Sequence, residues 1–84
     1  PRHQLDSITL ATCFGWDEAT FLARTEGSAI RRIGYSQWRR NVAIALGNAD
    51  TSDAVVQALQ SAVDDPSAVV REHVLWALAQ HTQR

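Results

Sequence analysis

Apolar residues at helical spacing constrain the fold of this chain more than any other feature. After Ser36, the residues Trp38, Val42, Ala45 and Leu46 recur at positions i, i+4, i+7 and i+8. This spacing places them on one face of an α-helix. No stretch of the sequence alternates apolar and polar residues in the way that predicts a half-buried β-strand. The sequence therefore predicts an all-α fold.

The helical pattern is repeated later in the chain. When residues 38–48 are laid over residues 70–80, at an offset of 32, the matches are Arg39 with Arg71, Val42 with Val74, Ala45 with Ala77, and Leu46 with Leu78. Helix pairs that recur at such intervals are typical of helical solenoids. The run D-D-P-S-A-V-V-R is similar to the start of the second helix of a HEAT-like repeat. We therefore predict a HEAT-like helical repeat of about two helix pairs, preceded by short N-terminal helices.

Glycine, proline and capping residues indicate where the helices end. Gly47 and Asn48 follow the apolar stripe and predict the end of that helix. Asp65 followed by Pro66 predicts an N-cap and the first residue of the last helix. In that helix Trp76 lies on a second apolar stripe beside the main one, so we expect contacts with neighbours on two sides.

Length and composition bound the class of protein. The chain has 84 residues, enough for one domain (1–84). Its apolar runs are far shorter than the roughly 20 residues that a membrane helix needs. The single cysteine fits a reducing compartment, and we expect a cytoplasmic protein. Because the sequence opens without Met at P-R-H-Q, we interpret it as a fragment of a longer protein.

The charges are separated along the chain although the net charge is only −1. Residues 24–40 carry a local charge of +4, and residues 50–72 carry a local charge of −4. All eight basic residues are arginines, whose planar guanidinium groups suit bidentate contacts with phosphate. We expect a bipolar molecule that presents a positive surface to an anionic partner.

Residues with catalytic potential do not form a recognisable set. His73 and His81 lie eight positions apart, without a second group of ligands and without a C-x-x-C or H-E-x-x-H motif. Cys13 falls on an apolar helix face and is expected in the core. We therefore expect no catalytic residue and no metal site in this chain.

The arginines have both binding and structural interpretations. Arg31 and Arg32 adjoin two predicted helix ends, where guanidinium groups and exposed N–H groups can hold a phosphate together, or where they can serve packing. Arg39 and Arg40 point about 100° apart on a helix, so we expect one to face a partner and the other to brace the fold. Arg71 is interpreted as a structural residue that ties neighbouring helices together.

The three tryptophans raise the possibility of base stacking, because aromatic side chains bind unpaired bases. Helical spacing places Trp38 in the core, and Trp16 stands just before a predicted N-cap, where a packing role is expected. The sequence does not decide whether Trp76 lies on the buried or the exposed side of its helix.

Three segments carry a resemblance to a known family. They are T-E-G-S-A-I-R-R-I-G-Y, W-R-R-N-V-A-I-A-L-G-N and V-R-E-H-V-L-W-A-L-A-Q, with L-D-S and F-G-W-D-E-A-T-F-L near the start. Together they resemble the C-terminal region of bacterial epoxyqueuosine reductases. The family's motif maps here onto Gly27, Ser28, Arg31, Arg32, Gly34, Arg40, Asn41, Gly47 and Asn48.

The resemblance implies a parent enzyme that uses cobalamin and two 4Fe–4S clusters to reduce epoxyqueuosine to queuosine in the tRNA anticodon loop. It implies that the clusters and the cobalamin belong to upstream domains and that a HEAT-like C-terminal domain helps to hold the tRNA. The ferredoxin-type cysteine motif is absent from this sequence, so the contribution of the fragment to the function of the parent enzyme would be RNA docking.

We therefore predict a non-catalytic domain whose partners are the tRNA anticodon arm and the upstream domains of the same chain. The charge pattern selects four RNA-binding candidates: Arg31, Arg32, Arg39 and Arg40. The alternative is an interdomain or protein–protein packing module without direct RNA contact. RNA contact requires exposed arginines, whereas packing requires that the parent protein cover them.

Overall fold

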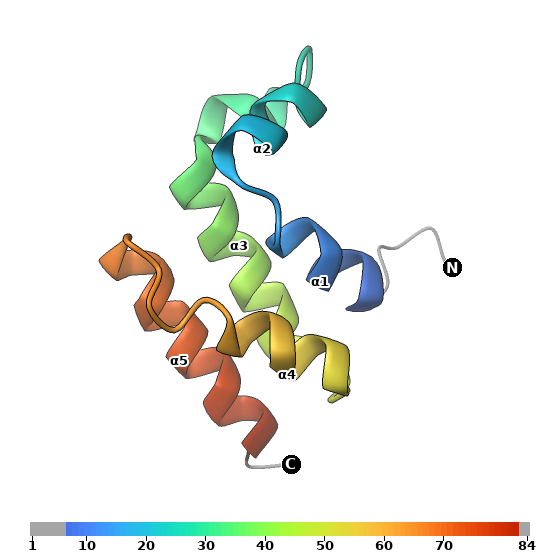
Figure 1. Cartoon of the computed structure of the whole chain (residues 1–84), viewed down its shortest axis with the longest axis vertical. Coiled ribbons are helices and arrows are strands. Elements are labelled where there is room, and N and C mark those ends of the chain that lie inside the picture. The colour runs from blue at the N-terminus through green and yellow to red at the C-terminus, as the bar shows by residue number, and fades with distance from the viewer. Residues whose placement is uncertain (1–6, 83–84) are drawn as a thin grey trace.

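The computed structural model describes residues 7–82, and every regular element in that range is helical. In chain order these are α1 (Ser7–Phe14), α2 (Glu18–Arg24), the 3₁₀-helix η1 (Ala29–Ile33), α3 (Tyr35–Asn48), α4 (Asp53–Gln60) and α5 (Ala68–Thr82) (Figure 1). The prediction of an all-α fold is confirmed. The more specific HEAT-like assignment stays a prediction.

Helices α3 and α5 form the centre of the structure, lying side by side and running in the same direction (Figure 1). Near their first residues the hydroxyl of Ser36 lies 2.9 Å from that of Ser67. Toward their ends Gly47 of α3 lies close against Ala77 of α5. These two helices contain the segments that match at an offset of 32, and adjacent parallel packing is what stacked repeats require. Helix α1 packs against α3 and α4.

A buried histidine fastens the C-terminal ends of the central pair. His81 is 7% exposed, and its Nε2 lies 2.7 Å from the carbonyl oxygen of Leu46. Because a carbonyl only accepts hydrogen bonds, Nε2 carries the proton in this contact. Its Nδ1 lies 2.7 Å from the hydroxyl of Thr51, which donates to it in the neutral imidazole. His81 therefore has a structural role between α5, the end of α3 and the loop that follows.

The core is made by one apolar face of each α-helix, and η1 contributes no buried residue to it. Its largest fully buried side chains are Phe14, Phe21, Leu46, Leu59, Val55, Val70 and Val74. An aromatic group extends it toward α2, where the ring of Trp38 lies 5.5 Å from that of Trp16 and 4.9 Å from that of Phe21, between centroids. The core position predicted for Trp38 is confirmed, and the packing role expected of Trp16 takes the form of stacking on it.

The start of α5 differs from the prediction. Ser67 caps this helix, because its Oγ accepts from the backbone N–H of Val70 at 3.3 Å, and α5 begins at Ala68. Asp65 instead accepts from the backbone N–H of Ser67 at 2.9 Å and forms an ion pair with Arg39. Its carboxylate therefore shapes the turn before α5, two residues upstream of the cap.

The predicted end of this helix at Gly47 and Asn48 is confirmed, because α3 ends at Asn48 and Gly47 is its last residue but one. A Cβ at this position would lie 2.4 Å from Cζ3 of Trp76 and 3.0 Å from Cα of Ala77. Both distances are shorter than van der Waals contact allows, and Ala77 presents backbone there. Glycine is required at this position because α5 crosses α3 closely.

We expect Gly47→Val to lower the free energy of unfolding by about 1–3 kcal/mol, because the added atoms force α3 and α5 apart. Gly15→Val is the control, since a Cβ there would meet only the carbonyl oxygen of Thr12, at an ordinary 3.4 Å. Urea unfolding followed by circular dichroism measures both variants. Equal midpoints would contradict the close crossing at Gly47.

A second prediction tests the buried stripe of α3. Leu46 is fully buried, and Leu46→Ala is expected to cost about 2–5 kcal/mol through lost burial and an unfilled cavity. Leu75→Ala makes the same substitution at a side chain that is 58% exposed, and we expect a change near zero. Thermal melting of the two variants should separate them clearly. Similar losses at both positions would show that this face of α3 is misassigned.

Candidate nucleic-acid interface

The segment between α2 and α3 holds two of the four arginine candidates on a tight turn. Thr25 ends α2, and the backbone N–H of Ser28 donates to its carbonyl at 2.9 Å. Between them Gly27 has a φ of +79°, a conformation that favours glycine. The Ser28 hydroxyl then accepts from the N–H of Ile30 at 3.1 Å and caps η1. Gly34, with φ +86°, joins η1 to α3.

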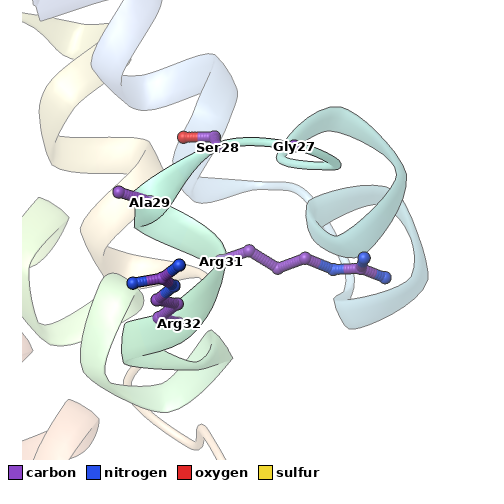
Figure 2. Close-up of a pocket in the computed structure, with 5 residues that line it drawn as sticks. All are labelled: Gly27, Ser28, Ala29, Arg31 and Arg32. Carbon is purple, nitrogen blue, oxygen red and sulfur yellow. The ribbon is translucent and has the colours of Figure 1, made fainter.

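An open depression of about 610 Å³ lies on this turn, lined by Gly27, Ser28, Ala29, Arg31 and Arg32 (Figure 2). All five residues are exposed. The backbone N–H groups of Gly27 and Ala29 make no hydrogen bond to any other residue in the range 7–82. The depression therefore combines two guanidinium groups with two available amide donors, which are the groups that bind phosphate oxygens.

The two arginine side chains leave η1 in different directions (Figure 2). Arg31 extends along one side of the turn, and Arg32 extends from the other side toward Ala29. This geometry does not suit the chelation of one phosphate by both guanidinium groups. It suits contacts with two separate phosphates, such as neighbouring ones along a nucleic-acid strand.

Arg40 provides a third accessible guanidinium, on α3. The side chain is half-buried, and its Nη2 donates to Oδ1 of Asn41 at 3.0 Å. An amide oxygen orients the guanidinium without neutralising it. Arg40 therefore retains its full charge on a surface that solvent reaches.

Arg39 is separated from the other three candidates. Its side chain is 9% exposed, and its Nε and Nη2 each lie 3.0 Å from Oδ2 of Asp65. Its Nη1 donates to the carbonyl oxygen of Phe14, and its guanidinium lies 4.2 Å from the centre of the Phe14 ring. The four arginines of the sequence prediction do not form one surface, because burial and a carboxylate engage Arg39 inside the fold. Of the expected pair, Arg39 is the bracing residue, and the partner-facing role of Arg40 stays a prediction.

Arg71, which matches Arg39 in the repeat, is also structural, as predicted. Its Nη1 donates to the backbone carbonyl of Asp65 at 2.6 Å. Arg39 thus links α3 to the carbonyl of Phe14 at the end of α1. In the same way, Arg71 links α5 to the carbonyl of Asp65 in the loop after α4.

The distribution of ion pairs leaves the exposed arginines uncompensated. Within residues 7–82 the ion pair between Arg39 and Asp65 is the only one. Arg31, Arg32 and Arg40 therefore have no carboxylate partner among these residues. In Figure 1 the turn that carries Arg31 and Arg32 lies at the opposite end of the molecule from α4, which begins at Asp53. The positive field expected at the α2–α3 end stays a prediction, which the unpaired guanidinium groups of Arg31 and Arg32 favour.

Groups that might support catalysis are dispersed. Burial raises the pKa of the Cys13 thiol, which reduces the thiolate available for nucleophilic chemistry. Among the described residues, no three His, Cys, Asp or Glu side chains gather where they could hold a metal ion. None of the helices in the same part of the chain has the length and apolar character needed to cross a membrane.

A second exposed feature, the indole of Trp76, was not predicted from the sequence. It is 40% exposed, whereas Trp38 is 9% exposed and stacks on Trp16. Helix α5 contacts both α3 and α4, as expected of a helix with two apolar stripes, but Val69 and Trp76 on the adjoining stripe stay 47% and 40% exposed.

Comparison with known proteins relates this chain to one group of enzymes. Epoxyqueuosine reductase of Xanthomonas campestris is 60% identical over 80 residues, which cover 95% of this chain and 22% of the relative. The Pseudomonas aeruginosa enzyme of the same name is 53% identical over 81 residues, and that of Escherichia coli is 45% identical over 84 residues. No protein-family model and no solved structure matches the chain.

The chain spans about a fifth of the length of these relatives, 22% in each of the three. The match includes nearly every residue of the chain, and therefore the turn with Arg31 and Arg32. Along almost its whole length, this chain is homologous to one part of the epoxyqueuosine reductases.

Proposed function

We propose that this chain is the C-terminal tRNA-docking domain of an epoxyqueuosine reductase. In this proposal the parent enzyme is an oxidoreductase of queuosine biosynthesis that reduces epoxyqueuosine to queuosine in the anticodon loop of tRNA. The chain itself holds the anticodon arm while the reaction takes place elsewhere in the parent protein. Its partners are the tRNA and the upstream domains of the same chain, and its compartment is the cytoplasm.

The observation that carries this proposal is the turn at Gly27–Arg32. Two exposed guanidinium groups stand beside two backbone N–H groups, and within residues 7–82 the former have no carboxylate partner and the latter no hydrogen bond. The structural arginines Arg39 and Arg71 differ from them, because their guanidinium groups donate hydrogen bonds to other residues of the fold. The charge of Arg31 and Arg32 is therefore available to an anionic partner.

Cofactors belong to the proposed parent rather than to this chain. A 4Fe–4S cluster is held by four cysteine thiolates, and the sequence contains one cysteine. We therefore place both clusters and the cobalamin in upstream domains. The contribution of this chain is to position the RNA.

Docking through phosphates has a recognisable thermodynamic signature. Each phosphate that an arginine neutralises releases condensed counterions, so affinity falls steeply as salt rises. Such contacts fix the position of the RNA without reading its sequence. We include Arg31, Arg32 and Arg40 in the contact set and leave out Arg39, because its guanidinium is engaged with Asp65 and Phe14.

The alternative is a packing module whose arginines bind acidic surfaces of the upstream domains. Exposure within this chain is compatible with both functions, because other domains of the parent could cover the turn. Binding to RNA separates them directly, since a packing module has no affinity for an RNA hairpin beyond nonspecific attraction.

We expect Arg31→Ala with Arg32→Ala to weaken binding of the chain to a tRNA anticodon stem-loop and to flatten its salt dependence. Loss of two phosphate contacts should reduce the slope of log K against log salt by about 2. Fluorescence anisotropy at several salt concentrations provides both quantities.

Two controls make this experiment decisive. Arg31→Lys with Arg32→Lys keeps the charge and loses the planar fork, so most of the salt slope should remain. Circular dichroism should show an unchanged fold, because neither side chain is buried. If the alanine variant is folded and keeps the wild-type affinity and slope, the docking surface has been assigned to the wrong residues.

A further inference from the structure

The seam between α3 and α5 contains a pocket that the docking surface does not use. Ile44 of α3 and Glu72, His73 and Trp76 of α5 line an open cavity of about 370 Å³. Trp76 contributes the only tryptophan ring in residues 7–82 that is not part of the stacked group around Trp38. An accessible aromatic ring beside polar groups is the arrangement that binds unpaired bases.

The indole of Trp76 is held in place by the close crossing of the two helices. A Cβ at position 47 would lie 2.4 Å from Cζ3 of Trp76, so the ring occupies the space that glycine leaves open on α3. The ring nevertheless remains 40% exposed. It is therefore positioned by the fold and still accessible to a ligand, which lowers the entropy cost of stacking.

The polar groups of the pocket are hydrogen-bond acceptors. Nδ1 of His73 lies 2.8 Å from the carbonyl oxygen of Val69 and must donate to it. The neutral imidazole then has an acceptor at Nε2. The ionised carboxylate of Glu72 only accepts, and it has no cationic partner among the described residues. A ligand that fits the pocket must present a flat face to Trp76 and N–H donors to these acceptors.

We propose that the pocket binds an unpaired nucleobase that carries an exocyclic amino group. The base stacks on Trp76, and its amino group donates to Glu72. Cytosine, adenine and guanine carry such a donor, whereas uracil does not. This inference rests on the proposed function, because it takes the ligand to be the single-stranded part of the docked RNA.

Charge around the pocket favours a base over a phosphate or an apolar peptide. Glu72 repels phosphate, so the backbone of the RNA is excluded from the pocket itself. An apolar segment would bury the Glu72 carboxylate without a cationic partner and Nε2 of His73 without a hydrogen-bond donor, which is unfavourable. Arg40 lies one helical turn before Ile44 on the same face of α3, about 6 Å along the axis, where it can contact the phosphate next to a bound base.

The test compares RNA ligands with and without unpaired bases. The probes are an RNA hairpin with adenine, cytosine and guanine in its loop, the same hairpin with a loop of uracils, and a blunt duplex of the same stem. Trp76→Ala should weaken binding of the first hairpin by about 5- to 150-fold, the range expected for loss of one stacked base. The salt slope should stay unchanged, because no phosphate contact is lost, and binding of the duplex should stay as in the wild type.

Conservative variants test the separate roles. Trp76→Phe keeps an aromatic face and should restore most of the affinity. Glu72→Gln exchanges one acceptor oxygen for a donor and should reduce the preference for the amino-bearing loop over the uracil loop. Leu75→Ala, at another exposed apolar side chain of α5, should bind like the wild type.

The outcomes distinguish this inference from the docking proposal. If Trp76→Ala binds the amino-bearing hairpin as tightly as the wild type while Arg31→Ala with Arg32→Ala weakens it, the base pocket is wrong and docking stands. Equal weakening of hairpin and duplex by Trp76→Ala would also overturn the pocket. If the wild-type chain binds none of the RNAs at low salt, both proposals fail. Self-association that disappears in Trp76→Ala would assign the surface to a protein contact instead.

Discussion

The buried contacts of Arg39 hold the parts of this structure together. Its guanidinium forms an ion pair with Asp65, donates to the carbonyl at the end of α1 and lies over the Phe14 ring, so one side chain joins α1, α3 and the turn before α5. Asp65 in turn accepts from the backbone of Ser67, and its own carbonyl accepts from Arg71. Removal of one partner from such a pair leaves a buried charge uncompensated, at a cost of about 3–5 kcal/mol. The orientation of α5 against α3 depends on this network, and the pocket at Trp76 depends on that orientation.

The same residue type serves two purposes in this small domain, and burial separates them. The guanidinium groups of Arg39 and Arg71 donate hydrogen bonds to backbone carbonyls, and that of Arg39 also to a carboxylate, within the fold. Arg31 and Arg32 stand on an exposed turn whose shape is set by Gly27 and Ser28, without ion pairs in the described part of the chain. Within the described residues the second pair forms no ion pair, so its charge is available for a ligand. This division supports docking through the backbone of an RNA, with Trp76 as the point where the nature of a base can matter.

Periodicity in the sequence predicted the helical class and most of the core, because burial of Trp38, Val42, Leu46 and Val74 follows directly from helical spacing. It failed where a tertiary contact decides the role of a residue. Gly47 and Asn48 correctly indicate the end of α3, but no local signal reveals that the crossing of α5 requires glycine at position 47. Asp65 before a proline reads as an N-cap, but its carboxylate is engaged by Arg39, which is 26 positions earlier in the chain. In the candidate site, neighbouring arginines were expected to differ in role, and only the three-dimensional position of Asp65 and Phe14 shows that Arg39 is the buried member.

The most direct test of the account is a map of RNA contacts on the chain in solution. Backbone and arginine side-chain N–H signals of the ¹⁵N-labelled chain would be followed by NMR during titration with an anticodon stem-loop. The account predicts shifts at Gly27, Ala29, Arg31, Arg32 and Arg40, with the side-chain N–H signal of Arg39 unaffected because Asp65 and Phe14 already occupy its donors. Shifts confined to the acidic α4 region, or no shifts at low salt, would contradict the assignment of this turn as an RNA-docking surface.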